Sequence, residues 1–255
     1  MKFRPSFWGL ILTCCLFIAS VGSSSAQSPE EFLMSADEIL GTANMLELQN
    51  RQMIGTFETD KGVGNLTLTQ TPDGKFRETW DFGGYTLDIG FDGDQLWMKE
   101  TPGTYSPKID PTFQIDRFWF SNMINLVGLH SQKNKGIEIQ PIGLSEVEGL
   151  PTFTVRAVTK TGDFVDYAID TENMQIKRTQ AVLINGSNEM MLAITYRNYE
   201  EINGALISTE WIMQRNGDAT NHIIFKQVND NVEIPDYYFM NPVKKAEQIE
   251  LENQR

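Results

Sequence analysis

Apolar and polar residues alternate along residues 64–97, and this pattern predicts a series of antiparallel strands. In the first run Leu66 and Leu68 share one face, and in the next run aromatic side chains do the same. Between the two runs, Pro72-Asp73-Gly74 is typical of a hairpin turn. Further alternating residues follow, separated by glycine-containing turns. The segment therefore predicts a meander with one large apolar face, which a core, a partner or a ligand must cover.

Strand patterns resume in the second half of the chain. Asn203-Gly204 and Asn216-Gly217 are dipeptides favoured in tight hairpin turns. Together with the first meander and a strand near 53–57, these runs give about eleven strands at intervals of roughly 8–14 residues, a pattern typical of a large antiparallel barrel or sandwich. The later strands are expected at residues 137–139, 152–158, 164–169, 174–184, 190–199, 205–214 and 222–228.

Two stretches have the apolar spacing of helices. The first begins at Ser28-Pro29, with proline in its first turn and Glu30-Glu31 placed to favour the helix dipole. The second follows a Pro/Gly-rich loop at 101–111 and carries a stripe made of Ile115, Phe118, Trp119, Met123, Leu126 and Leu129. Such a stripe is typical of ordinary core packing, and the alternative is a lid over a bound ligand.

The first 26 residues have the features of a cleavable signal peptide. A short basic segment precedes an apolar run at 7–21, and small residues at Ser24-Ser25-Ala26 predict cleavage after Ala26. The alternative is a membrane anchor, but the apolar run is shorter than the roughly 20 residues that span a bilayer. Cys14 and Cys15 lack the small preceding residue of a lipidation site, so both are expected to leave with the signal. A cysteine-free exported chain indicates the periplasm of a Gram-negative bacterium.

Charge narrows the classes of partner. The 21 basic residues include Lys2 and Arg4, so 19 would remain after cleavage against 34 acidic residues, a net charge of −15. This balance argues against nucleic acid and against electrostatic docking on anionic membranes. An acidic surface either keeps copies of the chain apart or attracts a basic protein partner.

Catalytic patterns are scarce. The two histidines, His130 and His222, have no spaced set of further ligands for zinc, and no serine lies in a nucleophile-elbow motif. Asp92-Gly93-Asp94 resembles part of a calcium loop but lacks the later ligands, and a turn explains it. We therefore expect no metal, no cofactor and no enzymatic activity. A converging pair of carboxylates is the catalytic arrangement that the composition leaves open.

The order of these elements resembles the LolA/LolB-like superfamily of outer-membrane lipoprotein-sorting proteins. The matching residues are Gly64, Leu66, Leu68, Pro72, Phe76-Arg77, Asp92-Gly93, Leu96-Trp97, Glu148-Gly149-Leu150-Pro151, Tyr167-Ala168-Ile169-Asp170, Tyr199-Glu200-Glu201-Ile202-Asn203-Gly204, Ile234-Pro235, Phe239 and Pro242. Each motif is short, and the resemblance depends on their order along most of the chain. Thr71 stands before the loop proline, where the soluble carriers of this family have a basic residue.

The resemblance implies a mainly β (α+β) fold, in which a curved antiparallel sheet forms an incomplete β-barrel and helices plug its concave face. It assigns residues 27–242 to this domain and leaves 243–255 as a charged tail. It also implies a monomeric periplasmic carrier that shelters the acyl chains of lipoproteins or other lipids. The predicted lipid-binding residues are Leu66, Leu68, Phe76, Trp80, Leu87, Ile89 and Trp97 in the cavity, and Phe118, Trp119 and Met123 on the lid. The alternative is a non-catalytic sensor or protein-interaction module on the same scaffold.

Overall fold

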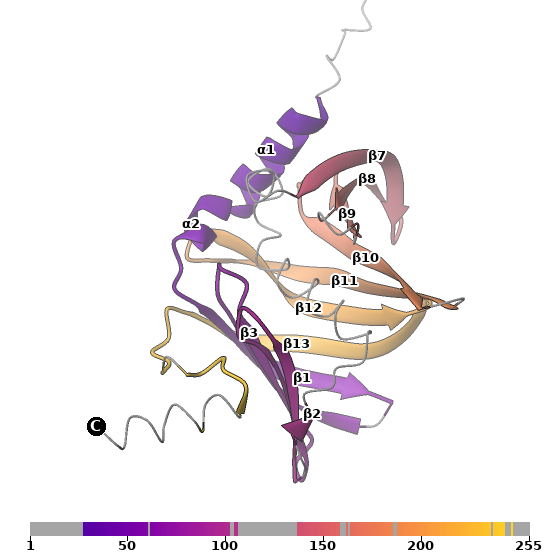
Figure 1. The fold of residues 1–255 in the computed structure, drawn as a ribbon. Helices are drawn as coiled ribbons and strands as arrows, with labels where there is room; N and C mark the ends of the chain where they lie inside the picture. Colours follow the sequence, from indigo (N-terminus) through magenta and orange to yellow (C-terminus); the bar gives the residue numbers. More distant parts are fainter. Residues whose placement is uncertain are drawn as a thin grey trace, which may run out of the picture.

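The computed structural model describes residues 28–60, 62–102, 105–106, 137–158, 162, 164–185, 188–235, 237–242 and 246. Within these residues, helices α1 (Pro29–Leu40) and α2 (Thr42–Leu46) precede a single antiparallel sheet of thirteen strands (Figure 1). The strands are β1 (Arg51–Thr59), β2 (Gly62–Gln70), β3 (Phe76–Asp81), β4 (Thr86–Phe91), β5 (Leu96–Thr101), β6 (Tyr105–Ser106), β7 (Glu138–Val147), β8 (Leu150–Val158), β9 (Phe164–Asp170), β10 (Ile176–Asn185), β11 (Asn188–Ile202), β12 (Ala205–Arg215) and β13 (Asp218–Asp230).

The sheet is curved and does not close. Its strand order is β6-β5-β4-β3-β2-β1-β13-β12-β11-β10-β9-β8-β7, so every neighbour is consecutive in sequence except the pair β1–β13. Its two edges are β6 and β7, which are themselves consecutive along the chain. The prediction of a mainly β, incomplete barrel is confirmed. One short strand beyond the predicted runs, β6, falls in the stretch expected to be a loop.

Strand β7 is longer than the three-residue run expected at 137–139. Its continuation passes Pro141 and a register shift between Pro141 and Gly143, where Gly143 has a φ of 131°. Proline is tolerated because β7 is an edge strand whose outer N–H groups need no partner. Leu144, farther along the strand, is 82% exposed. The strand therefore lacks the regular alternation by which the other strands were found.

The first predicted helix is present but divided in two. Ser28 and Glu31 form a capping box at the start of α1, and Pro29 occupies its first turn. The chain then turns at Gly41, which has a φ of 72° and ends α1. A Cβ atom there would lie 2.1 Å from the carbonyl oxygen of Gly204, so only glycine permits this close approach. The second predicted helix, with Phe118, Trp119 and Met123, lies outside the described residues.

The face of the sheet toward the helices, called here the concave face, carries the core. Buried side chains of α1, including Phe32, Leu33 and Leu40, belong to the same apolar cluster as inward side chains of the strands. Both helices contact β12, and the ring of Phe32 lies edge-on to Phe153 of β8, 5.1 Å between centroids. Figure 1 shows α1 beside β7–β9 and α2 above β12. The helices thus cover the half of the concave face formed by the later strands.

The opposite, convex face of β2–β5 is covered by the segment after β13. The indole of Trp97 donates to the carbonyl oxygen of Phe239 at 2.9 Å, and Arg77 lies 5.0 Å from the ring centre of Tyr238. Asn241 also donates to Gln95 at 3.1 Å. In the part of the chain that the structure describes, no helix is long and apolar enough to cross a membrane.

Candidate functional site

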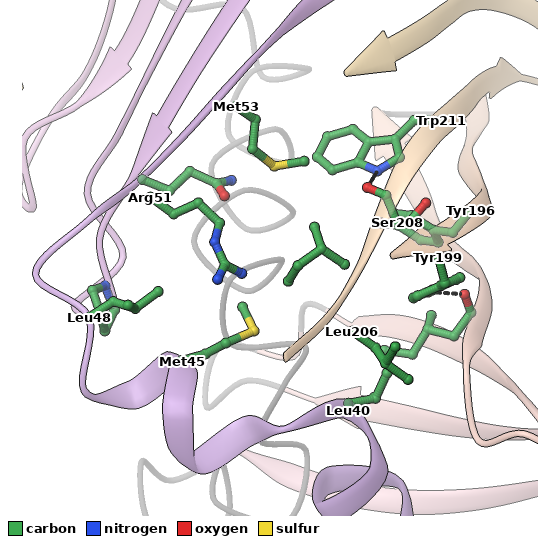
Figure 2. Close-up of a pocket in the computed structure, with 14 residues that line it drawn as sticks. Leu40, Met45, Leu48, Arg51, Met53, Tyr196, Tyr199, Leu206, Ser208 and Trp211 are labelled. Carbon is green, nitrogen blue, oxygen red and sulfur yellow. Dashed lines mark hydrogen bonds between the residues drawn. The ribbon is translucent and has the colours of Figure 1, made fainter. Parts of the chain in front are cut away.

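An apolar cavity of about 80 Å³ lies between the two helices and the concave face (Figure 2). It is lined by Leu40, Met45, Leu48, Arg51, Met53, Gln70, Pro72, Ile176, Tyr196, Tyr199, Leu206, Ile207, Ser208 and Trp211. Most of its surface is aliphatic, aromatic or thioether. Two methionines add flexible side chains that adapt to irregular shapes. The cavity is therefore suited to apolar matter rather than to a polar metabolite.

The break between the helices forms one side of the cavity. Because Gly41 turns the chain, Leu40 at the end of α1 and Met45 in α2 both reach the cavity. The opposite side comes from β1 and β12, which supply Met53 and Leu206. Helix α2 is attached to the sheet by the side-chain amide of Asn44, which donates to the carbonyl oxygen of Gly204 at 2.7 Å.

Aromatic side chains form the far wall. Trp211 and Tyr196 meet nearly at right angles, with ring centres 5.8 Å apart. The Tyr196 hydroxyl is within 3.0 Å of Thr179 Oγ1, and the Tyr199 hydroxyl donates to the carbonyl oxygen of Ile176 at 2.5 Å. Burial raises the pKa of both phenols well above the ordinary value, so both stay neutral at physiological pH. This wall presents rings to the cavity and no charge.

At the polar end of the cavity lies Arg51, which forms a buried ion pair with Asp230 behind the lining, between β1 and β13. Arg51 Nε donates to Asp230 Oδ1 at 2.7 Å and Arg51 Nη2 donates to Asp230 Oδ2 at 3.0 Å. The two side chains are only 5% and 4% exposed. Burial alone would raise the pKa of Asp230, but hydrogen bonds from Arg51 and Asn203 and the charge of Arg51 outweigh it, so the pKa lies below its usual value. The carboxylate is therefore ionised and the pair is neutral as a unit.

Two hydrogen-bond donors at this end have no acceptor among the described residues. They are Arg51 Nη1 and the side-chain nitrogen of Gln70, and both are buried. Arg51 and Gln70 are directly opposite each other in the β1–β2 pair and so project from the same face. Figure 2 shows the guanidinium of Arg51 between the side chains of Met45 and Met53.

The predicted lipid-binding residues occupy a different part of the molecule. Leu66, Leu68, Phe76, Trp80 and Ile89 are buried together on the concave face of β2–β4, and Leu87 packs against them. None of these six is among the residues that line the cavity. They are core side chains, held by cross-strand pairs such as Leu66–Trp80 and Trp80–Leu87.

Trp97 does not join that group, because it projects from the convex face. Its register partner is Gly90, which lacks a side chain, and a Cβ atom there would lie 2.3 Å from the indole. The neighbouring residue Leu96, paired with Phe91, points into the core instead. The structure therefore places Trp97 on the face opposite Leu66, and its part in lipid binding stays a prediction. The lid residues Phe118, Trp119 and Met123 lie outside the described residues.

The sequence analysis did not predict the residues that line the cavity, but one pattern in the sequence points to one of them, Arg51. Met53 and Phe57 alternate inward along β1, and the same period places Arg51 inward as well. A charged residue at an apolar position of an alternating strand points to a buried polar site. The contributions of α2 and β12 carry no comparable signal, because they depend on how the helices pack on the sheet.

The described residues offer little for catalysis. No cluster of three or more His, Cys, Asp or Glu side chains able to hold a metal ion occurs among them. His222 Nε2 lies 2.8 Å from Glu210 Oε1 on neighbouring strands, away from the cavity. Asp92 Oδ1 accepts from the backbone of Asp94 and Gln95, as expected of a turn. No carboxylate is among the described residues that line the cavity.

No protein-family model matches the sequence, and no curated protein matches it. Solved structures do match the fold. A LolA superfamily protein from Nitrosomonas europaea has 12% sequence identity and a TM-score of 0.53, covering 82% of this chain and 98% of its own. A DUF1329 family protein from Desulfovibrio piger has 12% identity and a TM-score of 0.51, covering 82% of this chain and 97% of its own. At such identity the likeness concerns architecture alone: this chain shares its fold with these two proteins.

Proposed function

We propose that this protein binds lipid and acts as a periplasmic carrier of lipids or of lipoproteins, sheltering their acyl chains against the concave face. The observation that carries the proposal is the apolar cavity between α1–α2 and β12, within a fold shared with a LolA superfamily protein. Export rests on the predicted signal peptide at residues 1–26. The remaining chain, 27–242, would be the lipid-binding domain.

The chemistry of the lining fits this role. Acyl chains are held by the apolar area they bury, at about 25 cal/mol per Å², and need neither catalytic groups nor charge. Leu206, Met45 and Trp211 supply such area. A carrier that both takes up and releases its cargo gains from contacts of this undirected kind, because few directed bonds have to be broken at release.

The size of the cavity indicates how uptake would proceed. Pockets that enclose a drug-sized ligand measure about 300–1,000 Å³, well above the 80 Å³ present here. A whole acyl chain therefore requires that α2 move away from β12. Among the described residues, the contacts to be released include apolar ones at Met45 and the hydrogen bond from Asn44 to Gly204. Helix α2 has only five residues, so few contacts hold it in place.

The test is a binding titration with parinaric acid and its methyl ester, two fluorescent acyl probes. We expect saturable binding to the purified protein. Leu206→Trp, which fills the cavity, should weaken it about tenfold or more, equivalent to about 1.4 kcal/mol. The matched control is Leu144→Trp, the same change at an exposed position of β7, which should bind like the unmodified protein.

Two results would contradict the proposal. One is the absence of saturable uptake of either probe. The other is equal binding by the Leu206→Trp and Leu144→Trp variants, because the cavity would then not be the site. Native mass spectrometry of protein purified from its expression host supplies an independent measurement, with lipid of defined mass expected to accompany the protein. Trp80 is unsuitable as a test position, since its side chain belongs to the core.

A further inference from the structure

A row of polar residues lies on the concave face at the edge of the cavity. Gln70 of β2, Arg51 of β1 and Asp230 of β13 are consecutive register partners across three neighbouring strands. The next residue in this row, Phe76 on β3, is fully buried in the core. Polar side chains in such surroundings are retained at a cost in stability, and hydrogen bonding normally compensates it.

The guanidinium group of Arg51 makes its hydrogen bonds on the side toward Asp230 only, as far as the described residues show. Its Nε and Nη2 atoms donate hydrogen bonds to Asp230, whereas neither Nη1 nor the side-chain nitrogen of Gln70 has an acceptor among the residues that the structure describes. Both residues are 4% exposed, so bulk water does not supply the missing partner. Both also line the cavity, which places two unpaired donors at one end of a space with apolar walls.

We propose that this end of the cavity is a binding site for the neutral carbonyl oxygen of an acyl ester or amide, which accepts hydrogen bonds from Arg51 Nη1 and Gln70 Nε2. This inference rests on the proposed lipid-binding function and names the chemical group that the site recognises. One carbonyl oxygen has two lone pairs and can serve both donors. The acyl chain attached to it would extend along Met45, Met53 and Leu206.

Charge favours a neutral carbonyl over a carboxylate. The positive charge of Arg51 is already balanced by Asp230, which lies in direct contact with it. A fatty-acid anion would add a second negative charge beside Asp230, and burying a charge without a counterion is strongly unfavourable. An ester or amide oxygen satisfies the same donors without adding charge. We therefore expect esterified or amide-linked acyl groups to bind more tightly than ionised free fatty acids.

The experiment measures displacement of parinaric acid methyl ester by three competitors with the same chain. Methyl laurate carries the carbonyl, methyl dodecyl ether lacks it, and laurate carries a charge instead. We expect methyl laurate to bind about tenfold more tightly than the ether, as two buried hydrogen bonds of ordinary strength would give. Laurate at neutral pH should bind more weakly than methyl laurate. With an isotope label on the ester carbonyl of methyl laurate, the infrared C=O stretching frequency in the complex should be lower than in an apolar solvent, because the oxygen accepts hydrogen bonds.

Gln70→Leu removes one donor and leaves the ion pair intact, so it should reduce the preference for ester over ether to about threefold. The matched control is Gln52→Leu, the same change on the next strand but on the convex face, which should leave the preference unchanged. Circular dichroism and the thermal midpoint establish that both variants are folded. The comparison of the three competitors on the unmodified protein needs no variant.

The outcomes separate the two proposals. If the parinaric probes do not bind, the lipid-binding function fails and this inference fails with it. If the probes bind but ester and ether are equal, the carbonyl site is refuted while the carrier function stands. Tighter binding of laurate than of methyl laurate would identify a carboxylate site instead and overturn the inference. An unchanged ester preference in Gln70→Leu would do the same.

Discussion

The buried ion pair at the junction of β1 and β13 allows a quantitative prediction about stability. Arg51 and Asp230 are 179 residues apart in sequence and directly opposite in register. Replacing Asp230 by leucine leaves the guanidinium without its partner in a site where only 5% of that side chain is exposed. Removing one member of a buried pair typically costs about 3–5 kcal/mol. The loss also includes the hydrogen bond that Asn203 donates to Asp230 at 2.9 Å.

Such a loss is a large fraction of the total, since domains are stable by only about 5–15 kcal/mol. Arg51→Met leaves the carboxylate unpaired and should cost a similar amount. The double variant Arg51→Met/Asp230→Leu replaces the pair by apolar side chains, which is often neutral or stabilising by about 1–4 kcal/mol. We therefore expect the double variant to be more stable than either single one.

Urea unfolding followed by circular dichroism measures these free energies, with a constant m-value required for comparison. Additive losses in the double variant would refute the reasoning, because they would show that the two charges do not stabilise each other. The pH dependence gives a second readout. The pKa of Asp230 is lower in the folded state, so its stabilising effect is complete above the unfolded value of about 3.9 and is lost as pH falls through the folded value. The Asp230→Leu variant should lack this contribution.

Two further predictions concern the core and the tyrosines. Phe76→Ala, at a position with no exposed surface, should lower the free energy of unfolding by about 3–5 kcal/mol. Leu206→Ala, beside the existing cavity, should lower it by less than about 2 kcal/mol. Equal losses for the two variants in urea unfolding would contradict the separation of core from cavity. Burial raises the pKa of Tyr167, Tyr196 and Tyr199, so the stability they contribute is complete below about pH 10 and declines above it. In an alkaline titration followed by phenolate absorbance, part of the signal should therefore appear only when the protein unfolds. If all seven tyrosines ionise while the circular dichroism spectrum is still native, the prediction is refuted.

The alternation of residues was sufficient to predict most of the sheet. Period two fixes which side chains share a face, so the common placement of Leu66, Leu68, Phe76 and Trp80 follows from sequence alone. The pattern is ambiguous where two large apolar residues are adjacent, as at Leu96-Trp97. Either could face the core, and the choice depends on a distant segment that covers one of them.

The candidate site was less accessible to sequence reasoning because it is made by tertiary packing. Its floor comes from β1 and β12, and its cover comes from a helix break at Gly41 that requires the backbone of Gly204 nearby. Neither glycine indicates this contact on its own. Arg51 could have been recognised as an inward charge, but its partner Asp230 is 179 residues away in sequence, at the end of β13, and no local pattern connects them.

The single pairing between strands distant in sequence, β1 with β13, has a consequence for how the molecule assembles. Every other neighbouring pair in the described sheet joins consecutive strands, and such local hairpins form early because their loop-closure entropy is small. Strand β1 is the first strand to leave the ribosome, and its outer edge stays unpaired until β13 follows. During that interval Met53 and Phe57 belong to an open strand edge, the kind of surface that pairs with other chains. The seam at β1–β13 is thus the step of folding most in need of protection from aggregation.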